Sequence, residues 1–289
     1  MKYRFLIVLF LISTTAFAQD SYIQYLNKLD RNDINSISLA ISKLEKIGSN
    51  YSASKYDEIY FKFEEFCYEV INKVNENLSQ KMHEKLDNYP EDLTKVSYNK
   101  VQDKEIKNLL ILLNKNYCEL NSTEGTYFID LKADAMKKIF VSKTSNSLKE
   151  FITIRDNEQK ERFFEDAILM ISFEKLGQRI ITWENFIKKY PKAKITKDAE
   201  YFYYIYLGTF LQGLANTPTT DDGGNLLPEI KTVYENFIKR YPTARSGKIV
   251  SDYLNIFKKN NYKLNRGEII TFLKANKIPR TEGVQLHLR

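Results

Sequence analysis

Two stretches of this sequence are nearly the same: Glu184-Asn-Phe-Ile-Lys-Lys-Tyr-Pro-Lys-Ala193 and, 51 residues later, Glu235-Asn-Phe-Ile-Lys-Arg-Tyr-Pro-Thr-Ala244. Eight of the ten positions are identical, and one of the other two exchanges Lys189 for Arg240. Chance is a poor explanation for such a match, whereas duplication of one structural unit accounts for it. The repeat therefore decides how the C-terminal half of the chain is interpreted.

Each copy has the pattern of a helix that ends at a proline. In the first copy, Trp183, Phe186 and Tyr190 fall on one helical face, and the proline disfavours helix at the tyrosine before it. The apolar residues that follow predict a second helix in each copy. We therefore expect two antiparallel helix pairs, over residues 177–215 and 228–260, which must stack because neither pair buries its apolar face alone.

A first helix that ends in Phe-Ile-Lys-Lys-Tyr-Pro and leads into a second helix resembles tetratricopeptide-type helical repeats. Such Tyr-Pro endings are similar to those of exported bacterial repeat proteins that act as adaptors of the cell envelope. The resemblance covers residues 177–260. It implies α-solenoid-type packing of helix pairs and binding of another protein, and it transfers no catalytic residue.

The N-terminal half also shows helical periodicity. Apolar residues recur in steps of three and four over residues 34–47. The same steps continue from Ile59 to Leu86 and predict one long helix that ends before Tyr89-Pro90. Four leucines within residues 109–113 mark the centre of another helix.

Patterns of period two are scarce, and the segment from Thr126 to Asp130 is a candidate extended piece. The polar residues 121–125 are typical of a linker. The sequence therefore predicts an all-α protein, with a bundle of long helices over residues 19–121 and a C-terminal helical region over residues 122–289.

The first eighteen residues have the three-part pattern of a secretory signal. Lys2 and Arg4 precede an unbroken apolar run, Phe5–Ile12, and small residues stand just before Gln19. The run is far shorter than the roughly 20 residues that a membrane-spanning helix needs, and no later stretch is long and apolar enough. We therefore expect cleavage before Gln19 and export to the periplasm or the cell exterior.

The chain contains two cysteines and two histidines among its 289 residues. In an exported protein Cys67 and Cys118 can pair, and in the chain-entropy model such a bridge adds about 4 kcal/mol. Two buried thiols that act as small apolar side chains are the alternative. With His83 as the one histidine inside the body, zinc sites and histidine-based triads are disfavoured, and we expect no cofactor and no metal.

The densest charged cluster lies within residues 155–166. Its carboxylates, Glu161 and Glu165 among them, are candidates for the acid and the base of an all-α glycan-cleaving enzyme. However, opposite charges in the cluster are four residues apart, as in Asp156 and Lys160. This spacing is typical of a solvated, ion-paired helix face.

The run Tyr201-Phe-Tyr-Tyr-Ile-Tyr206 is the clearest candidate for ligand binding. Consecutive aromatic residues on a helix point in all directions, so some of them pack inside, and the others present platforms to a sugar or an apolar peptide. With the repeat and the basic C-terminal part, the candidate binding surface comprises Trp183, Tyr203, Tyr204, Tyr206, Tyr234, Lys258 and Lys259.

The formal charge is +7, and it falls to +5 when the signal is removed. Residues 231–289 hold 13 Lys and Arg against 4 Asp and Glu. Such a basic region suits peripheral contact with an anionic surface or an acidic partner, and ordinary solvated lysines are the alternative. Nucleic acid is disfavoured as a partner by export and by the lack of a binding motif.

These observations lead to three hypotheses. The first is an exported, non-enzymatic helical-repeat protein that binds another envelope or secreted protein. The second is a binding module for an anionic or glycan ligand, and the third is the glycan-cleaving enzyme.

Overall fold

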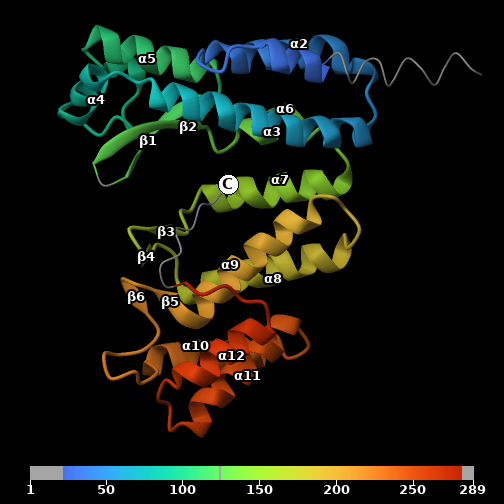
Figure 1. Ribbon diagram of the computed structural model, residues 1–289, viewed down its shortest axis with the longest axis vertical. Coiled ribbons are helices and arrows are strands. Elements are labelled where there is room, and N and C mark those ends of the chain that lie inside the picture. The colour runs from blue at the N-terminus through green and yellow to red at the C-terminus, as the bar shows by residue number, and fades with distance from the viewer. Residues whose placement is uncertain (1–21, 124, 282–289) are drawn as a thin grey trace, which may run out of the picture. The chain divides into compact units, whose positions relative to one another are not determined.

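The computed structural model describes residues 22–123 and 125–281 (Figure 1). This part of the chain is mostly helical, with short antiparallel strand pairs. It divides into two compact units, one up to Asp156 (unit 1) and one from Asn157 (unit 2). The signal expected over residues 1–18, with its cleavage site before Gln19, lies outside the described residues. None of the helices described combines the length and the apolar character needed to cross a bilayer.

Unit 1 starts with a helix over residues 22–28, and its further elements follow in chain order. They are α2 (Asn35–Ile47), η1 (Gly48–Asn50), α3 (Ala53–Glu76), α4 (Gln80–Asp87), η2 (Tyr98–Lys100), α5 (Lys104–Lys115), β1 (Cys118–Thr123), β2 (Thr126–Leu131), α6 (Ala135–Phe140) and most of α7 (Asn146–Gln159). The core forms along the apolar face of α3. There the fully buried ring of Phe63 packs against that of Phe140 in α6, with centroids 5.5 Å apart.

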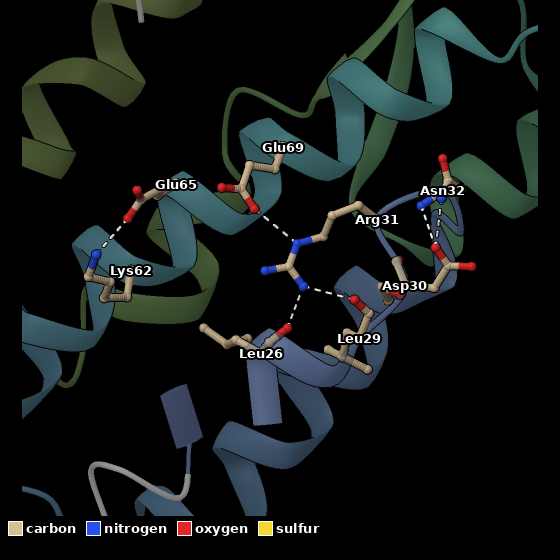
Figure 2. A network of polar contacts seen from close by, with 9 residues as sticks. Leu26, Leu29, Asp30, Arg31, Asn32, Lys62, Glu65 and Glu69 are labelled. Carbon is tan, nitrogen blue, oxygen red and sulfur yellow. Dashed lines mark hydrogen bonds and ion pairs between the residues drawn. The ribbon is translucent and has the colours of Figure 1, made fainter. Parts of the chain in front are cut away.

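Figure 2 shows how the first helix, residues 22–28, is joined to α3. The Nε atom of Arg31 donates a hydrogen bond of 2.9 Å to Oε2 of Glu69 in α3. The same guanidinium donates to the carbonyl oxygens of Leu26 and Leu29. Carbonyl groups at the end of a helix have no partner within it, so one side chain both satisfies them and ties the helix to α3.

The apolar stripe from Ile59 to Leu86 is divided between two helices, so the prediction of one long helix is wrong. α3 ends with Asn77 as its C-cap, and Ser79 starts α4. The hydroxyl oxygen of Ser79 accepts a hydrogen bond of 3.2 Å from the backbone N–H of Met82. Serine competes with the helix for backbone hydrogen bonds and therefore favours a cap position. The prediction followed the apolar spacing and did not take this preference of Ser79 into account.

The strands β1 and β2 form an antiparallel hairpin that pairs along its whole length. Asn75 of α3 holds it: the side-chain amide donates to the carbonyl of Ile129 and accepts from its N–H, each at 2.8 Å. The extended piece expected over residues 126–130 is confirmed. Residues 121–123 of the expected linker belong to strand β1, and the division between the two units falls after Asp156 and not at residue 121.

Unit 2 contains the last turn of α7 and two helix pairs, each preceded by a small hairpin. Its elements are β3 (Phe164–Glu165), β4 (Ile168–Leu169), α8 (Phe173–Lys189), α9 (Thr196–Gln212), β5 (Gly213–Leu214), β6 (Thr217–Pro218), α10 (Pro228–Arg240), α11 (Arg245–Lys259) and α12 (Arg266–Ala275). The helix pairs α8–α9 and α10–α11 correspond to those expected over residues 177–215 and 228–260.

The duplicated sequence folds in the same way in both copies. Tyr190 ends α8 with φ −124° and ψ 52°, and Tyr241 ends α10 with φ −129° and ψ 55°. Each tyrosine donates its backbone N–H to the carbonyl four residues earlier, of Phe186 or Phe237, at 2.9 Å. The rings of these two residue pairs pack with centroids 5.1 Å apart in both copies. Identical local sequence therefore gives matching helix ends.

The hairpins β3–β4 and β5–β6 were not expected from the sequence. The two loop residues of the first, Asp166 and Ala167, both have positive φ, as a tight two-residue hairpin turn demands. The hairpins touch, because the backbone N–H of Asn216 donates to the carbonyl of Ala167 at 3.1 Å. Neither hairpin has alternating apolar residues, because each strand is only two residues long.

Candidate functional site

The structure buries most of the aromatic residues that the sequence assigned to a binding surface. Trp183, Tyr203, Tyr206 and Tyr234 are each at most 1% exposed. They fill the interior of the helix pairs, so placing them on a surface was wrong. Tyr204 is half-buried, and Lys258 and Lys259 are exposed near the end of α11.

A buried polar cluster explains where two of these aromatic residues point. Oε1 of Glu158 accepts a hydrogen bond from Nε1 of Trp183, and Oε2 accepts one from the Tyr206 hydroxyl, each at 2.9 Å. The buried guanidinium of Arg179 donates to the backbone carbonyl oxygens of Glu158 and Glu161, at 3.2 and 2.8 Å. Both carboxylate oxygens of Glu158 are thus occupied, and the cluster ties the end of α7 to α8 and α9.

The spacing of charges within residues 155–166 predicted a solvated helix face. The structure shows a different arrangement. α7 ends at Gln159, and the side chains of Asp156 and Glu158 are 2% and 7% exposed. Asp156 lies in unit 1, where Oδ2 accepts from Nζ of Lys137 at 2.7 Å. A spacing of four residues predicts a common helix face only where the helix continues, and α7 ends within the cluster.

The two carboxylates proposed for glycan cleavage are on the surface and paired with cations. Glu161 contacts Nζ of Lys175 at 3.1 Å, and Glu165 contacts Arg162 at 3.3 Å. Their side chains are 52% and 41% exposed. A general acid needs burial that raises its pKa, so nothing in this arrangement equips either residue for that role.

An open groove lies where the β3–β4 hairpin leads into α8. It has a volume of about 420 Å³ and is lined by Glu161, Arg162, Met170, Ile171, Ser172 and Lys175. The ion pair of Glu161 with Lys175 lies in its wall. Its lining offers two apolar side chains, the exposed Met170 and the partly buried Ile171, among charged groups that already have partners.

A second surface feature is formed by the connections inside the two helix pairs, residues 188–197 and 239–248, which contain the Tyr-Pro motifs. These twenty residues include nine Lys and Arg side chains, all of them exposed, and no Asp or Glu. We call this set the connection face: Lys188, Lys189, Lys192, Lys194, Lys197, Lys239, Arg240, Arg245 and Lys248.

The second connection is tied to α8, the helix from which the first connection leads. The carboxylate of Glu184 accepts hydrogen bonds from the backbone N–H groups of Arg245 and Ser246, at 2.7 and 2.9 Å. This carboxylate caps α11, whose own N-cap residue, Ala244, has no side chain for the task. Both connections therefore lie on the same side of unit 2, as Figure 1 shows.

Arg245 is fixed at the junction of the two pairs. Its guanidinium donates a hydrogen bond of 2.7 Å to the hydroxyl of Tyr204 in α9. It also lies 5.6 and 5.5 Å from the ring centroids of Tyr203 and Tyr204. The sequence placed the basic character in residues 231–289 and missed the lysines of 188–197, although lysines surround the Tyr-Pro dipeptide in the first copy.

The two cysteines, both in unit 1, are free and buried, so the disulfide considered from the sequence is not formed in this structure. Burial raises the pKa of the Cys67 thiol well above its ordinary value, and the neighbouring Cys118 adds to this effect. Burial also raises the pKa of Cys118 to about 12. Thiols with such pKa values stay protonated at neutral pH, which makes them poor nucleophiles.

Among the described residues, no three His, Cys, Asp or Glu side chains gather into a group that could hold a metal ion. Comparison of the chain with protein-family models, curated proteins and solved structures finds no match.

Proposed function

We propose that this is an exported helical-repeat protein that binds another envelope or secreted protein through unit 2 and catalyses no reaction. The observation that carries the proposal is the equivalence of the two helix pairs. Their helix ends match in backbone angles and in ring packing, and the Glu184 carboxylate links one pair to the next. Stacked helix pairs with an ordered surface typically serve as binding scaffolds.

We further propose that the pairs pack as in tetratricopeptide-type α-solenoids. The period of 51 residues is longer than the roughly 34 typical of that family. The fifteen residues 213–227, which contain the β5–β6 hairpin and its following loop, lie between the pairs and account for most of the difference. The helix–connection–helix core spans 40 residues in the first copy (Phe173–Gln212) and 32 residues in the second (Pro228–Lys259).

The other two hypotheses lose most of the features on which they depended. Sugar platforms require exposed rings, whereas Trp183, Tyr203 and Tyr206 are buried, and within the run Tyr201–Tyr206 Tyr201 alone is exposed. Glycan cleavage requires a carboxyl group in a protected pocket, whereas Glu161 and Glu165 are half-exposed ion-pair partners. Protein binding requires neither.

Site-specific photo-cross-linking in the native cell tests the proposal. A photoreactive phenylalanine analogue would replace Tyr201 or Ile270, which are exposed in unit 2, and matched controls would carry it at Tyr68 or Ile111, which are exposed in unit 1. We expect discrete cross-linked species of higher mass from the unit 2 positions alone. Cross-linking confined to the unit 1 positions, or none at any position, would refute binding through unit 2.

A further inference from the structure

We infer that the connection face is the docking site for an acidic segment of the partner protein, with Arg245 as its central anchor. The inference rests on the proposed function, because it names the chemistry of the partner that unit 2 would bind. The proposed docking site includes residues from both copies of the repeat.

The charge of the connection face comes from residues far apart in the sequence. Five lysines belong to residues 188–197, and four Lys and Arg residues belong to residues 239–248. The Glu184 carboxylate, which links α8 to the second connection, is occupied by two backbone N–H groups. One of the nine, Lys248, forms an ion pair of 3.0 Å with Asp252 in α11. The remaining excess of positive charge attracts and orients acidic partners.

The geometry around Arg245 favours a carboxylate over a diffuse anionic surface. Guanidinium groups have five N–H donors, and one of those on Arg245 holds the Tyr204 hydroxyl. The two tyrosine rings and the capped start of α11 restrict the side chain before any partner binds. A pre-positioned guanidinium loses less entropy when it forms paired hydrogen bonds with Asp or Glu.

The tyrosines of the two Tyr-Pro motifs, Tyr190 and Tyr241, lie next to other cations of the connection face. Lys189 lies 5.0 Å from the ring centroid of Tyr190, and Arg240 lies 5.5 Å from that of Tyr241, so the two copies present a basic group in the same way. Within the two described connections, no large apolar side chain is exposed. Insertion into lipid therefore has no apolar anchor here, which favours an acidic protein segment over a membrane.

The test measures binding of a labelled poly-glutamate peptide to the chain from Gln19 to Arg289, by fluorescence anisotropy at low and at physiological salt. Vesicles of phosphatidylcholine with phosphatidylglycerol form a second arm. Arg245→Gln should weaken peptide binding about tenfold. The affinity of Arg245→Lys for the peptide should lie between those of Arg245→Gln and the wild type. Lysine keeps the positive charge but lacks the paired N–H donors of the guanidinium group.

Matched controls separate a docking site from general basicity. Lys192→Gln with Lys197→Gln removes two cations from the face and should weaken peptide binding about threefold. Lys274→Gln with Lys277→Gln removes the same charge at the end of α12, where both lysines are exposed, and should have little effect. Arg266→Gln, at an exposed arginine of α12, is the control for Arg245.

Three results would overturn the inference: no peptide binding by the wild type at physiological salt, equal losses in the face and control variants, or an effect of Arg245→Gln on vesicles alone. The proposed function is tested separately. If the cross-linked partner of unit 2 persists unchanged in Arg245→Gln, protein binding stands and the connection face is not its site. If no partner cross-links while the peptide binds as expected, the proposed function alone fails.

Discussion

The indole N–H of Trp183 donates a hydrogen bond of 2.9 Å to the buried carboxylate of Glu158, 25 residues earlier in the chain. The other oxygen of this carboxylate is bound by the Tyr206 hydroxyl. An acidic residue at the end of one helix thus receives donors from the next two helices. Since Trp183 is the single tryptophan of the chain, its fluorescence reports directly on the folding of unit 2.

Glu158→Gln should destabilise unit 2 by about 2 kcal/mol, because one of the two donors would face an NH₂ group in place of an acceptor. Urea unfolding followed by Trp183 fluorescence measures the change. Glu165→Gln removes the same charge from a half-exposed site and should cost less than about 0.5 kcal/mol. Equal effects of the two changes would contradict the structural role of Glu158.

Glu184→Ala should destabilise the start of α11 by about 1 kcal/mol, because it removes the carboxylate that caps two backbone N–H groups. Glu235 occupies the same position in the second copy and is exposed, so Glu235→Ala is the natural control. Hydrogen exchange of the first turn of α11 should accelerate in the first variant only. Unchanged exchange there would show that Glu184 does not cap this helix.

Gly247→Ala should be strongly destabilising, by about 2 kcal/mol or more, because an added Cβ would overlap the backbone carbonyl oxygen of Tyr241. Gly267→Ala in α12 has room for a Cβ and should be neutral or slightly stabilising, since alanine favours helix over glycine. Thermal unfolding of the two variants tests the contrast. A stable Gly247→Ala protein would refute this close approach at the second Tyr-Pro motif.

Asn75→Ala should loosen the β1–β2 hairpin of unit 1, because it removes two hydrogen bonds of 2.8 Å to Ile129. The expected cost is about 1–2 kcal/mol. Cys118 begins β1 and is buried, so its rate of modification by a thiol reagent should rise in the variant. Asn72→Ala, a substitution on the same helix, is the control, and equal rates in both variants would count against the role of Asn75.

Unit 1 should lose stability as the pH rises above about 9. The pKa of Cys118 is raised from 9.0 to about 12 by burial, so the unfolded chain releases this proton first. Stability from this thiol is complete below pH 9 and declines as the pH approaches 12, by at most about 1.4 kcal/mol per pH unit. Cys118→Ala should show a shallower decline when unfolding is followed by hydrogen exchange of α3. An equally steep decline would exclude the thiol as a cause.

Much of the fold follows from local patterns. The duplicated motif around Tyr190 and Tyr241 identified the helix ends, because a proline disfavours helix at the residue before it. Apolar spacing likewise located α2, α3 and α5. It did not show the break at Ser79, because the apolar stripe keeps its phase across the gap between α3 and α4.

The candidate site was harder to predict. Periodicity shows that Tyr203 and Tyr206 are apolar positions of a helix, but it does not show how many neighbouring helices cover them. Arg245 of α11 lies over the ring of Tyr203, and Tyr206 contacts Phe163, Arg179 of α8 and Glu158 of α7. For the same reason, the sequence showed the basic character of residues 231–289 and did not connect Arg245 with the lysines of residues 188–197.

The sequence by itself showed the duplication and determined the helices with their Tyr-Pro ends, because the end of a helix depends on residues within a few positions of one another. Only the tertiary structure decided which aromatic residues are buried and that cations about 50 residues apart form one face. Those outcomes depend on contacts such as that of Glu184 with Arg245, and no local pattern encodes them.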